Sequence, residues 1–221
     1  MIKALLCDMD GTLVESNWLH AQAWQDAFAS ADLKIDLEDI RRQIGKGADE
    51  LIPVFIPGPT QEVLKKPLTA YRQLLFQHKY LNQVKPFPRV RDFLLRLREV
   101  GIQISLASSA DQDQLGAYKK IAGIEDLIEV ESSADDVDRS KPHPDIFQAT
   151  LKKLQIQAKD AMALGDTPYD AEAASKAGLK TIGVTTGGWS EADLLAAGCL
   201  EVYRDVAELL DKFDTSALCR K

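Results

Sequence analysis

Short apolar segments alternate with amphipathic segments along most of this chain. Apolar segments without polar alternation indicate strands that are covered on both faces of a sheet. Four such strands are expected at residues 2–7, 102–107, 161–164 and 180–184, with shorter ones near 127–130 and 201–203.

Helical periodicity fills the intervals between these expected strands. The segment that begins at Val90 repeats apolar residues at the i, i+3, i+4 and i+7 positions of one helix face, and Gly101 is placed to end it. Strands that alternate with helices indicate a parallel sheet with helices on both faces. We therefore expect a Rossmann-like, three-layer α/β core. Further helices are expected at residues 111–121, from 145 onward, and at 169–177, 191–197 and 206–213.

Residues 16–84 interrupt this alternation. Helical patterns occur at residues 18–31, 37–44 and 67–82, with prolines between them and no convincing strand. We expect an α-helical cap domain at residues 16–84, inserted after the first strand. The core domain would then comprise residues 1–15 and 85–221, with the cap packed over the carboxyl ends of its strands.

The composition narrows the class of protein. With 221 residues and 45% hydrophobic content the chain can bury a large core, and no apolar stretch approaches the roughly 20 residues of a membrane helix. The net charge of −7 argues against general nucleic-acid binding. Three scattered cysteines, and no room for a signal peptide before the first strand, lead us to expect a cytoplasmic protein with reduced thiols. The sequence does not indicate an oligomeric state, and a monomer is compatible with it.

Two aspartates follow the first expected strand. Asp8 and Asp10 occupy positions i and i+2, which share one side of a strand, so both carboxylates can face a common site. Two like charges this close require a reason, such as a divalent cation that bridges them or a division of roles between a nucleophile and an acid. A helix N-cap would account for one aspartate but not for both.

Polar groups of particular kinds also follow later strands. Ser108 and Ser109 end the second long strand, and Lys141 stands in the segment SKPHPD. Asp166 and Asp170 stand in GDTPYD, where the third long strand ends. Ligands of parallel sheets bind at the carboxyl ends of the strands, where these groups would converge. Each group alone is interpretable as a turn, a solvated lysine or a helix cap, but their joint occurrence favours a catalytic site.

In this order the four motifs resemble those of the haloacid dehalogenase-like hydrolase superfamily, most of whose members are phosphatases. The resemblance covers nearly the whole chain, and the insertion after the first motif is similar to the helical-cap subclass with phosphoglycolate phosphatases and beta-phosphoglucomutases. It implies hydrolysis of a small phosphomonoester through an aspartyl-phosphate intermediate, with Mg²⁺ as cofactor. It also implies that the metal is held by Asp8, Asp166, the backbone carbonyl of Asp10 and, directly or indirectly, Asp170, and that the phosphate is held by Ser108, Ser109 and Lys141.

The catalytic roles would be divided between the first two aspartates. Asp8 would attack phosphorus, while Asp10 would protonate the leaving alkoxide and then take a proton from the attacking water. Since Asp10 must be protonated when substrate arrives, we expect its pKa to be raised by the charge of Asp8. Ser108 would hold a phosphoryl oxygen, and Lys141 would neutralise charge on the phosphate.

Two reactions remain open. The presence of Asp10 disfavours the dehalogenases and phosphonate hydrolases of this family, whose first motif lacks this aspartate. The metal pumps of the family are also disfavoured, because they carry membrane regions that this sequence does not show. Phosphate ester hydrolysis is favoured. Sugar phosphate mutation is the alternative, because His20 and Lys46 resemble cap residues with which the related mutases bind a hexose phosphate. We expect Glu15, His20 and Lys46 to contact the substrate.

Overall fold

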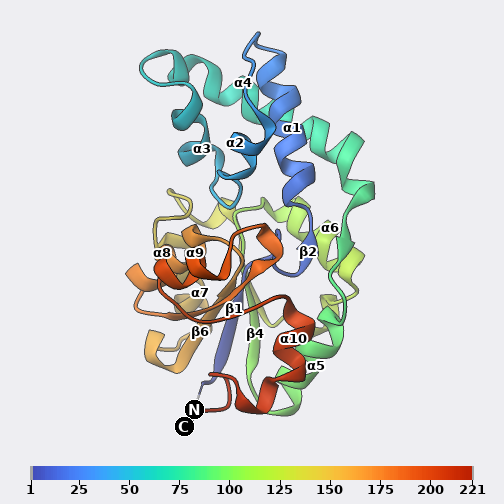
Figure 1. The fold of residues 1–221 in the computed structure, drawn as a ribbon, viewed down its shortest axis with the longest axis vertical. Helices are drawn as coiled ribbons and strands as arrows, with labels where there is room; N and C mark the ends of the chain where they lie inside the picture. The colour runs from blue at the N-terminus through green and yellow to red at the C-terminus, as the bar shows by residue number, and fades with distance from the viewer. Residues whose placement is uncertain (1, 221) are drawn as a thin grey trace.

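The computed structural model describes residues 2–220. Its central sheet contains β1 (Ala4–Cys7), β4 (Gln103–Ala107), β5 (Val130–Ser132), β6 (Ala161–Gly165), β7 (Lys180–Val184) and β8 (Cys199–Tyr203). The strand order is β5-β4-β1-β6-β7-β8, and every pair of neighbours is parallel. Helices lie on both sides of this sheet (Figure 1). The expected three-layer α/β core is confirmed.

The side chains of β1 explain why the sheet is covered on both faces. Leu5 and Cys7 belong to one hydrophobic cluster, and Ala4 and Leu6 belong to another, as the alternation of a strand requires. All four are fully buried. The first cluster includes residues of α5 (Val90–Glu99), α6 (Gln112–Ala122) and α10 (Val206–Asp211). The second cluster includes residues of α7 (Asp145–Leu154) and α8 (Pro168–Lys176). The short helix α9 (Glu191–Ala196) packs beside β7 and β8.

The register of the three central strands brings the polar groups that follow them together at one end of the sheet. Cys7, the last residue of β1, pairs with Leu106 of β4 and with Leu164 of β6. The residues that follow these strands therefore emerge side by side at their carboxyl ends. Among them are Asp8 and Ser108.

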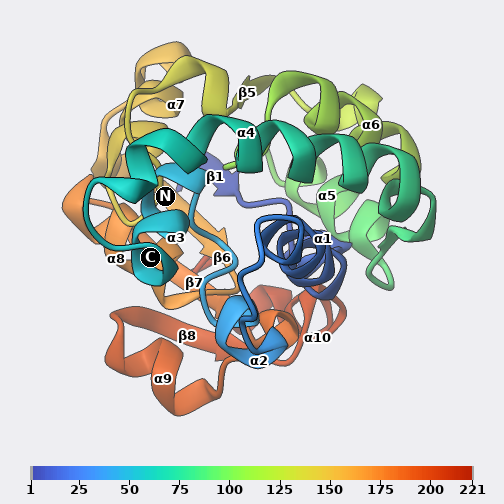
Figure 2. The ribbon, with the colours of Figure 1, turned by 90° about the horizontal axis from the view of Figure 1, so that it is seen from above.

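Residues 16–84, the cap segment, form helices over this end of the sheet (Figures 1 and 2). They share a hydrophobic cluster of their own, which includes Trp24, Phe28, Ile40, Leu51 and Leu68. On this arrangement we propose that the cap segment is a separate domain. Its elements are α1 (Asn17–Ala29), α2 (Leu37–Arg41), α3 (Ala48–Phe55), α4 (Thr60–Leu75), a π-helical turn (Phe76–Tyr80) and a 3₁₀ turn (Leu81–Gln83).

The two connections between the cap segment and the core lie next to each other. β2 (Val14–Glu15) leads into the cap segment and β3 (Lys85–Pro86) leads out of it. They pair as a short antiparallel ribbon, with Val14 opposite Pro86. The insertion therefore begins and ends at one place on the core.

The cap helices differ from the sequence expectations at two prolines. The sequence pattern indicates a break at Pro53, yet Pro53 lies inside α3. Its neighbours Leu51 and Ile52 are fully buried, and this burial outweighs the loss of one backbone hydrogen bond. α4 begins seven residues before Pro67 rather than at it. Pro67 is exposed, so solvent can satisfy the carbonyl group that its missing N–H leaves free.

The core elements follow the expected pattern with one clear shift. β5 comprises Val130–Ser132 instead of residues 127–130, because Glu125–Leu127 forms a 3₁₀ turn. Since β5 pairs with β4 from the position of Ser105 onward, the strand order is unaffected by this shift.

Candidate active site

A buried cluster of charged side chains lies at the carboxyl ends of β1 and β6. Lys141 Nζ is 2.6 Å from Asp8 Oδ1 and 2.7 Å from Asp170 Oδ1. Carboxylate oxygens of Asp8, Asp166 and Asp170 lie within 4.8 Å of one another. All four side chains are almost inaccessible to solvent. Three carboxylates thus share a buried site with one ammonium group, an excess of negative charge that is costly there.

The excess charge perturbs the carboxyl groups. Burial raises the pKa of Asp8 to about 7, against the opposing charge of Lys141 and with a contribution from Asp170. Burial likewise raises the pKa of Asp166 well above its usual range, and the charges of Asp170 and Asp8 add to the shift. Buried carboxylates that repel one another are stabilised when they bind either a proton or a cation.

The surroundings of Asp166 fit a divalent cation. Thr12 Oγ1 donates to Asp166 Oδ1 and Asn17 Nδ2 donates to Oδ2, each at 2.7 Å, so the carboxylate is fixed in orientation. A Cβ atom at Gly11 or Gly187 would lie 2.3 or 2.0 Å from Asp166 Oδ2, so both positions require glycine for the backbone to approach this closely. Mg²⁺ prefers carboxylate oxygens, and the cluster offers three carboxylates from two strand ends.

Asp170 links this cluster to the start of α8. Its Oδ2 accepts hydrogen bonds from the backbone N–H and the hydroxyl of Thr167, at 3.0 and 2.6 Å, in a capping box. The other oxygen, Oδ1, faces Lys141. The helix cap therefore fixes the carboxylate that holds the lysine in place beside Asp8.

The two serines after β4 differ in their contacts. Ser108 is fully buried, and its Oγ accepts a hydrogen bond from the backbone N–H of Ala110 at 3.1 Å. Ser109 Oγ donates to the backbone carbonyl of Gly45 in the cap segment, at 3.2 Å. Ser108 thus stays with the buried cluster, whereas the Ser109 side chain joins the core to the cap segment.

Asp10 contacts the cap segment rather than Asp8. Ser16 Oγ and His20 Nε2 lie 2.5 and 2.7 Å from Asp10 Oδ1. Burial alone would raise the pKa of Asp10, but its contacts with His20 and Ser16 lower this pKa to about 2. The expectation that Asp8 raises this pKa is wrong, because the cap histidine dominates the surroundings of the carboxyl group.

Sequence reasoning missed Arg72, which determines the proton position on His20. Arg72 Nη2 hydrogen-bonds to His20 Nδ1. Since a guanidinium group can only donate, Nδ1 carries no hydrogen, and the hydrogen on Nε2 is directed at Asp10. The His20 ring also stacks on Phe76, with ring centroids 4.0 Å apart. Arg72 stands midway between Leu68 and Phe76 at four-residue spacing, and a basic residue on the buried face of α4 is the signal that could have revealed it.

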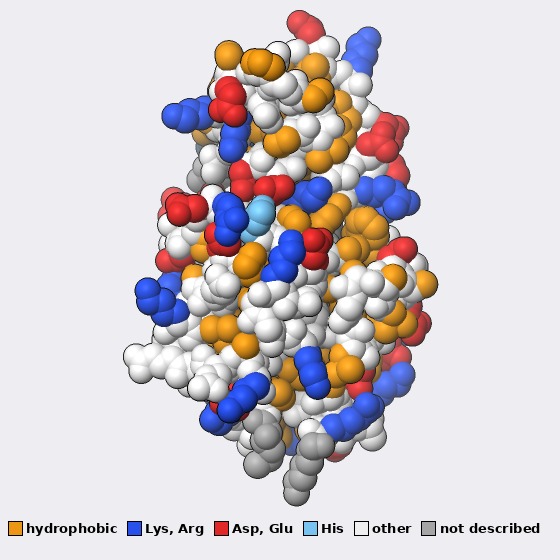
Figure 3. All heavy atoms as spheres, turned by 90° about the vertical axis from the view of Figure 1, so that its left-hand side faces the viewer, with side chains coloured by type: hydrophobic (Ala, Val, Ile, Leu, Met, Phe, Trp, Pro, Cys, Tyr) orange, Lys and Arg blue, Asp and Glu red, His pale blue; other side chains and the backbone are white. Residues whose placement is uncertain are grey.

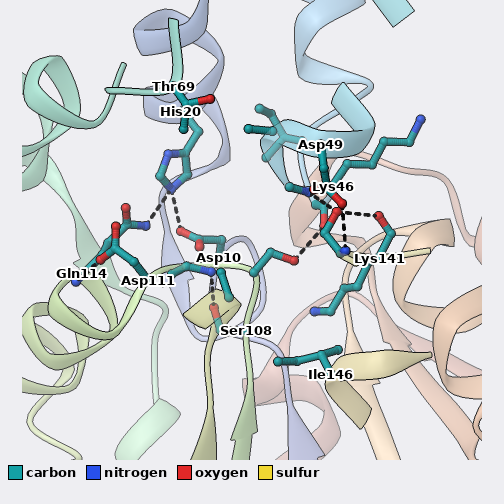
Figure 4. A pocket seen from close by; sticks show the side chains of 18 of the residues that line it. Asp10, His20, Lys46, Asp49, Thr69, Ser108, Asp111, Gln114, Lys141 and Ile146 are labelled. Atoms are coloured by element: carbon teal, nitrogen blue, oxygen red, sulfur yellow. Dashed lines mark hydrogen bonds and ion pairs between the residues drawn. The ribbon is translucent and has the colours of Figure 1, made fainter. Parts of the chain in front are cut away.

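A cavity of about 330 Å³ lies between the cap segment and the core. In Figure 4, Asp10, His20 and Gln114 lie on one side of it, and Lys46, Asp49 and Lys141 lie on the other. Its volume is at the lower end of the roughly 300–1,000 Å³ typical of small-molecule pockets. The candidate residues that line it are Asp8, Asp10, His20, Lys46, Ser108, Ser109 and Lys141.

Comparison with known proteins decides the family. Residues 5–184 match the sequence model for haloacid dehalogenase-like hydrolases. The chain belongs to this family. The phosphoglycolate phosphatase of Yersinia pestis is 32% identical to it over 84% of this chain and 82% of that protein.

Solved structures share the fold of this chain. A hydrolase from Pseudomonas syringae has a TM-score of 0.87 at 25% identity, covering 97% of this chain and 99% of that one. CbbY from Rhodobacter sphaeroides, in complex with phosphate, has a TM-score of 0.74 at 27% identity, covering 95% and 96% of the two chains.

Two residues of this haloacid dehalogenase-like hydrolase that we expected to contact the substrate are placed differently from that expectation. Glu15 is exposed on β2, opposite Lys85, and is not among the residues that line the cavity. Lys46 lines the cavity, but its Nζ donates to Gln43 at 2.7 Å and lies 4.6 Å from the centroid of the Tyr169 ring. We therefore leave Glu15 out of the proposed site.

Proposed function

We propose that this hydrolase is a Mg²⁺-dependent phosphatase that acts on a small phosphomonoester through an aspartyl-phosphate intermediate. The observation that carries the proposal is the placement of Asp8, 2.6 Å from the buried Lys141, at a cavity of about 330 Å³. The names of the Yersinia pestis phosphatase and the phosphate complex of CbbY support the same substrate class.

Asp8 is the proposed nucleophile. Its carboxylate attacks phosphorus, the bond to the leaving oxygen breaks, and water later releases the phosphate from the acyl phosphate. Lys141 neutralises charge on the nucleophile and the phosphoryl oxygens, and Ser108 hydrogen-bonds to one of these oxygens. Asp8, Asp166 and the backbone carbonyl of Asp10 would hold Mg²⁺, with Asp170 within reach; when bound, the ion supplies positive charge to the phosphoryl group.

Asp10 is the proposed acid and base, acting through Oδ2. Ser16 and His20 both hydrogen-bond to Oδ1, and these contacts orient the carboxyl group. With a pKa of about 2, Asp10 is ready as the base that takes a proton from water in the second step. For the first step Asp10 must be protonated. The negative charge of a bound phosphate raises the pKa of Asp10 and so favours its protonated form.

Replacement of Asp10 separates these two roles. We expect Asp10→Asn to slow hydrolysis of an alkyl phosphate by about 10²–10⁴-fold, because its leaving group needs a proton. With an aryl phosphate, whose leaving group departs unprotonated, the variant should accumulate phosphorylated enzyme since water is no longer activated. Acid quenching after reaction with ³²P-labelled aryl phosphate measures this species. Asp26→Asn, on α1 and paired with Lys79, is the matched control; equal losses on both substrates without labelled protein would contradict these roles.

Metal dependence tests the proposal as a whole. We expect hydrolysis of p-nitrophenyl phosphate in the presence of Mg²⁺ and a loss of at least about 10²-fold after removal of the metal with EDTA. Restoration by added Mg²⁺ checks that the loss is reversible. Absence of turnover with Mg²⁺ would refute the phosphatase proposal.

Sugar phosphate mutation remains the alternative. It is favoured by the burial of His20 against Asp10, together with the basic residue Arg72 behind it. A mutase would have to return the phosphoryl group from Asp8 to a sugar instead of to water. Incubation with a hexose 1-phosphate and the corresponding bisphosphate distinguishes the reactions, because an isomer accumulates in one case and free phosphate in the other.

For the partner and the cellular location of the protein, we propose only a general class. Among residues 2–220, no helix combines the length and hydrophobicity needed to cross a membrane. The net charge of −7 argues against a nucleic acid as the partner. The phosphoglycolate phosphatase relative supports a small phosphorylated metabolite instead. We retain a cytoplasmic location as a proposal on the cysteine pattern alone.

A further inference from the structure

We propose that the cavity selects phosphomonoesters whose leaving group carries hydroxyl or ammonium groups and no second negative charge. This inference rests on the proposed phosphatase function and concerns the part of the cavity beyond the phosphate. Besides Asp8, Asp10 and Lys141, four carboxylates and two cations line the cavity: Asp49, Asp111, Asp135 and Asp138, with Lys46 and Arg72.

The charge of Lys46 is already engaged. Its ammonium group donates to Gln43 and lies over the ring of Tyr169, as described above. Burial lowers the pKa of Lys46, and the carboxylates of Glu50 and Glu172 only partly oppose this shift. A second anionic group on a substrate would have to compete with these contacts.

Arg72 is even less available. Its guanidinium carbon lies 5.5 Å from the ring centroid of Trp24 and 5.3 Å from that of Phe76, and Nη2 donates to His20. Its Nε has no hydrogen-bond partner, but this atom is buried and cannot reach a ligand in the cavity. Burial lowers the pKa of Arg72, and the negative charges of Asp10 and Asp111 oppose this shift. Arg72 is therefore a support for His20 rather than an anion-binding group.

The carboxylates, in contrast, retain free acceptor capacity. Asp111 Oδ1 accepts from the backbone N–H of Gln114 at 2.8 Å, and its Oδ2 accepts from Gln73 at 3.1 Å. Asp49 Oδ2 accepts from the backbone N–H of Ser140 at 3.0 Å. Each carboxylate oxygen has two lone pairs, so these groups can accept further hydrogen bonds. Figure 4 shows Asp111 and Asp49 on opposite sides of the cavity, where they can bind hydroxyl or ammonium groups of one ligand.

The surface around the cavity mouth also carries charges of both signs. In Figure 3, acidic and basic side chains form a band where the cap segment meets the core. Some are already paired across this boundary, such as His143 with Glu50. The unpaired negative charge is therefore a property of the cavity lining rather than of one face as a whole. The proposed selectivity would differ from that of a phosphoglycolate phosphatase, because phosphoglycolate carries a carboxylate on its leaving group.

Three substrates with one carbon skeleton test the proposal. Glucosamine 6-phosphate, glucose 6-phosphate and 6-phosphogluconate carry a positive, neutral and negative leaving group, respectively. We expect kcat/KM with Mg²⁺ to be at least about tenfold lower for 6-phosphogluconate than for glucose 6-phosphate, and highest for glucosamine 6-phosphate. The same compounds are also measured as competitive inhibitors of p-nitrophenyl phosphate hydrolysis, so that binding is ranked even for a compound that turns over slowly.

Asp111→Asn tests whether the cavity lining causes this selectivity. Asparagine retains the helix cap of α6 while it removes the charge. We expect the preference for glucose 6-phosphate over 6-phosphogluconate to fall about threefold or more. Asp113→Asn, two residues further along and outside this cavity, makes the same charge change and should leave the preference unchanged.

The possible failures are distinguishable. Equal or better use and binding of 6-phosphogluconate, with p-nitrophenyl phosphate still hydrolysed, overturns the selectivity but not the phosphatase function. The same shift in Asp113→Asn as in Asp111→Asn assigns the preference to net charge and overturns the role of the cavity. No hydrolysis of the aryl phosphate with Mg²⁺ overturns the phosphatase function and this inference with it.

Discussion

We expect the Asp8→Asn variant to lose at least about 10⁴-fold in kcat and to remain folded. Asparagine has nearly the shape of aspartate but cannot form an acyl phosphate, so the first displacement has no nucleophile. The fold tolerates the change because it removes one of three clustered carboxylates. Lys141 keeps a partner in Asp170, 2.7 Å away. Steady-state hydrolysis of p-nitrophenyl phosphate measures the loss.

The pH dependence of stability gives this variant a second signature. The pKa of Asp8 in the folded protein, about 7, lies above its ordinary value of 3.8. The folded state then binds the proton more tightly than the unfolded state, so the wild type loses stability as pH rises from about 4 to about 7. Asp8→Asn lacks this loss. In urea unfolding without divalent cations, the variant should gain stability relative to wild type between about pH 5 and about pH 8; a relative loss would argue against the excess charge at this site.

Replacement of Lys141 has the largest expected effect on stability. Lys141→Met removes the ammonium group that pairs with Asp8 and Asp170 and leaves buried carboxylates uncompensated. Breaking such a pair costs about 3–5 kcal/mol in the free energy of unfolding. The loss should be smaller at acidic pH, where the carboxyl groups take up protons, and smaller with Mg²⁺. We expect kcat to fall by about 10³-fold as well, since phosphoryl charge is no longer stabilised.

A matched control for this variant lies far from the site. Lys212 pairs with Glu208 at 2.7 Å on the surface of the core. Lys212→Met removes the same charge from an exposed pair, which contributes little to stability. Chemical unfolding of both variants, with and without Mg²⁺, makes the comparison. Equal small effects of the two substitutions would show that Lys141 is not needed to balance the buried carboxylates.

The sequence predicts the backbone positions of the site better than its side-chain contacts. Asp8 and Ser108 follow apolar segments that can only be buried strands, and parallel pairing brings such strand ends together. The contact of Asp10 with His20 could not be predicted, because it depends on the angle at which α1 leaves the core. For the same reason the direction of the Asp10 pKa shift was wrongly expected from the neighbouring Asp8 alone.

The cap segment shows the same limit. Its helices are predicted in part from periodicity, but Pro53 and Pro67 obscure α3 and the start of α4. Tertiary burial decides these cases, and it leaves no mark in a single sequence at such positions. Arg72 lies on α4, and its role becomes visible only when that helix is placed against His20. Whether Glu15 or Lys46 touches substrate depends on the same packing.

The ribbon of β2 and β3 has a consequence for the exchange of parts between related proteins. Because Val14 pairs with Pro86, the chain leaves the core and returns to it at adjacent points. A segment of another length or fold can occupy this position without pulling the sheet apart, since its ends already meet and little chain entropy is lost in closing it. Grafting a foreign cap between residues 15 and 85 would thus alter what enters the cavity while the sheet and its strand-end groups stay as they are.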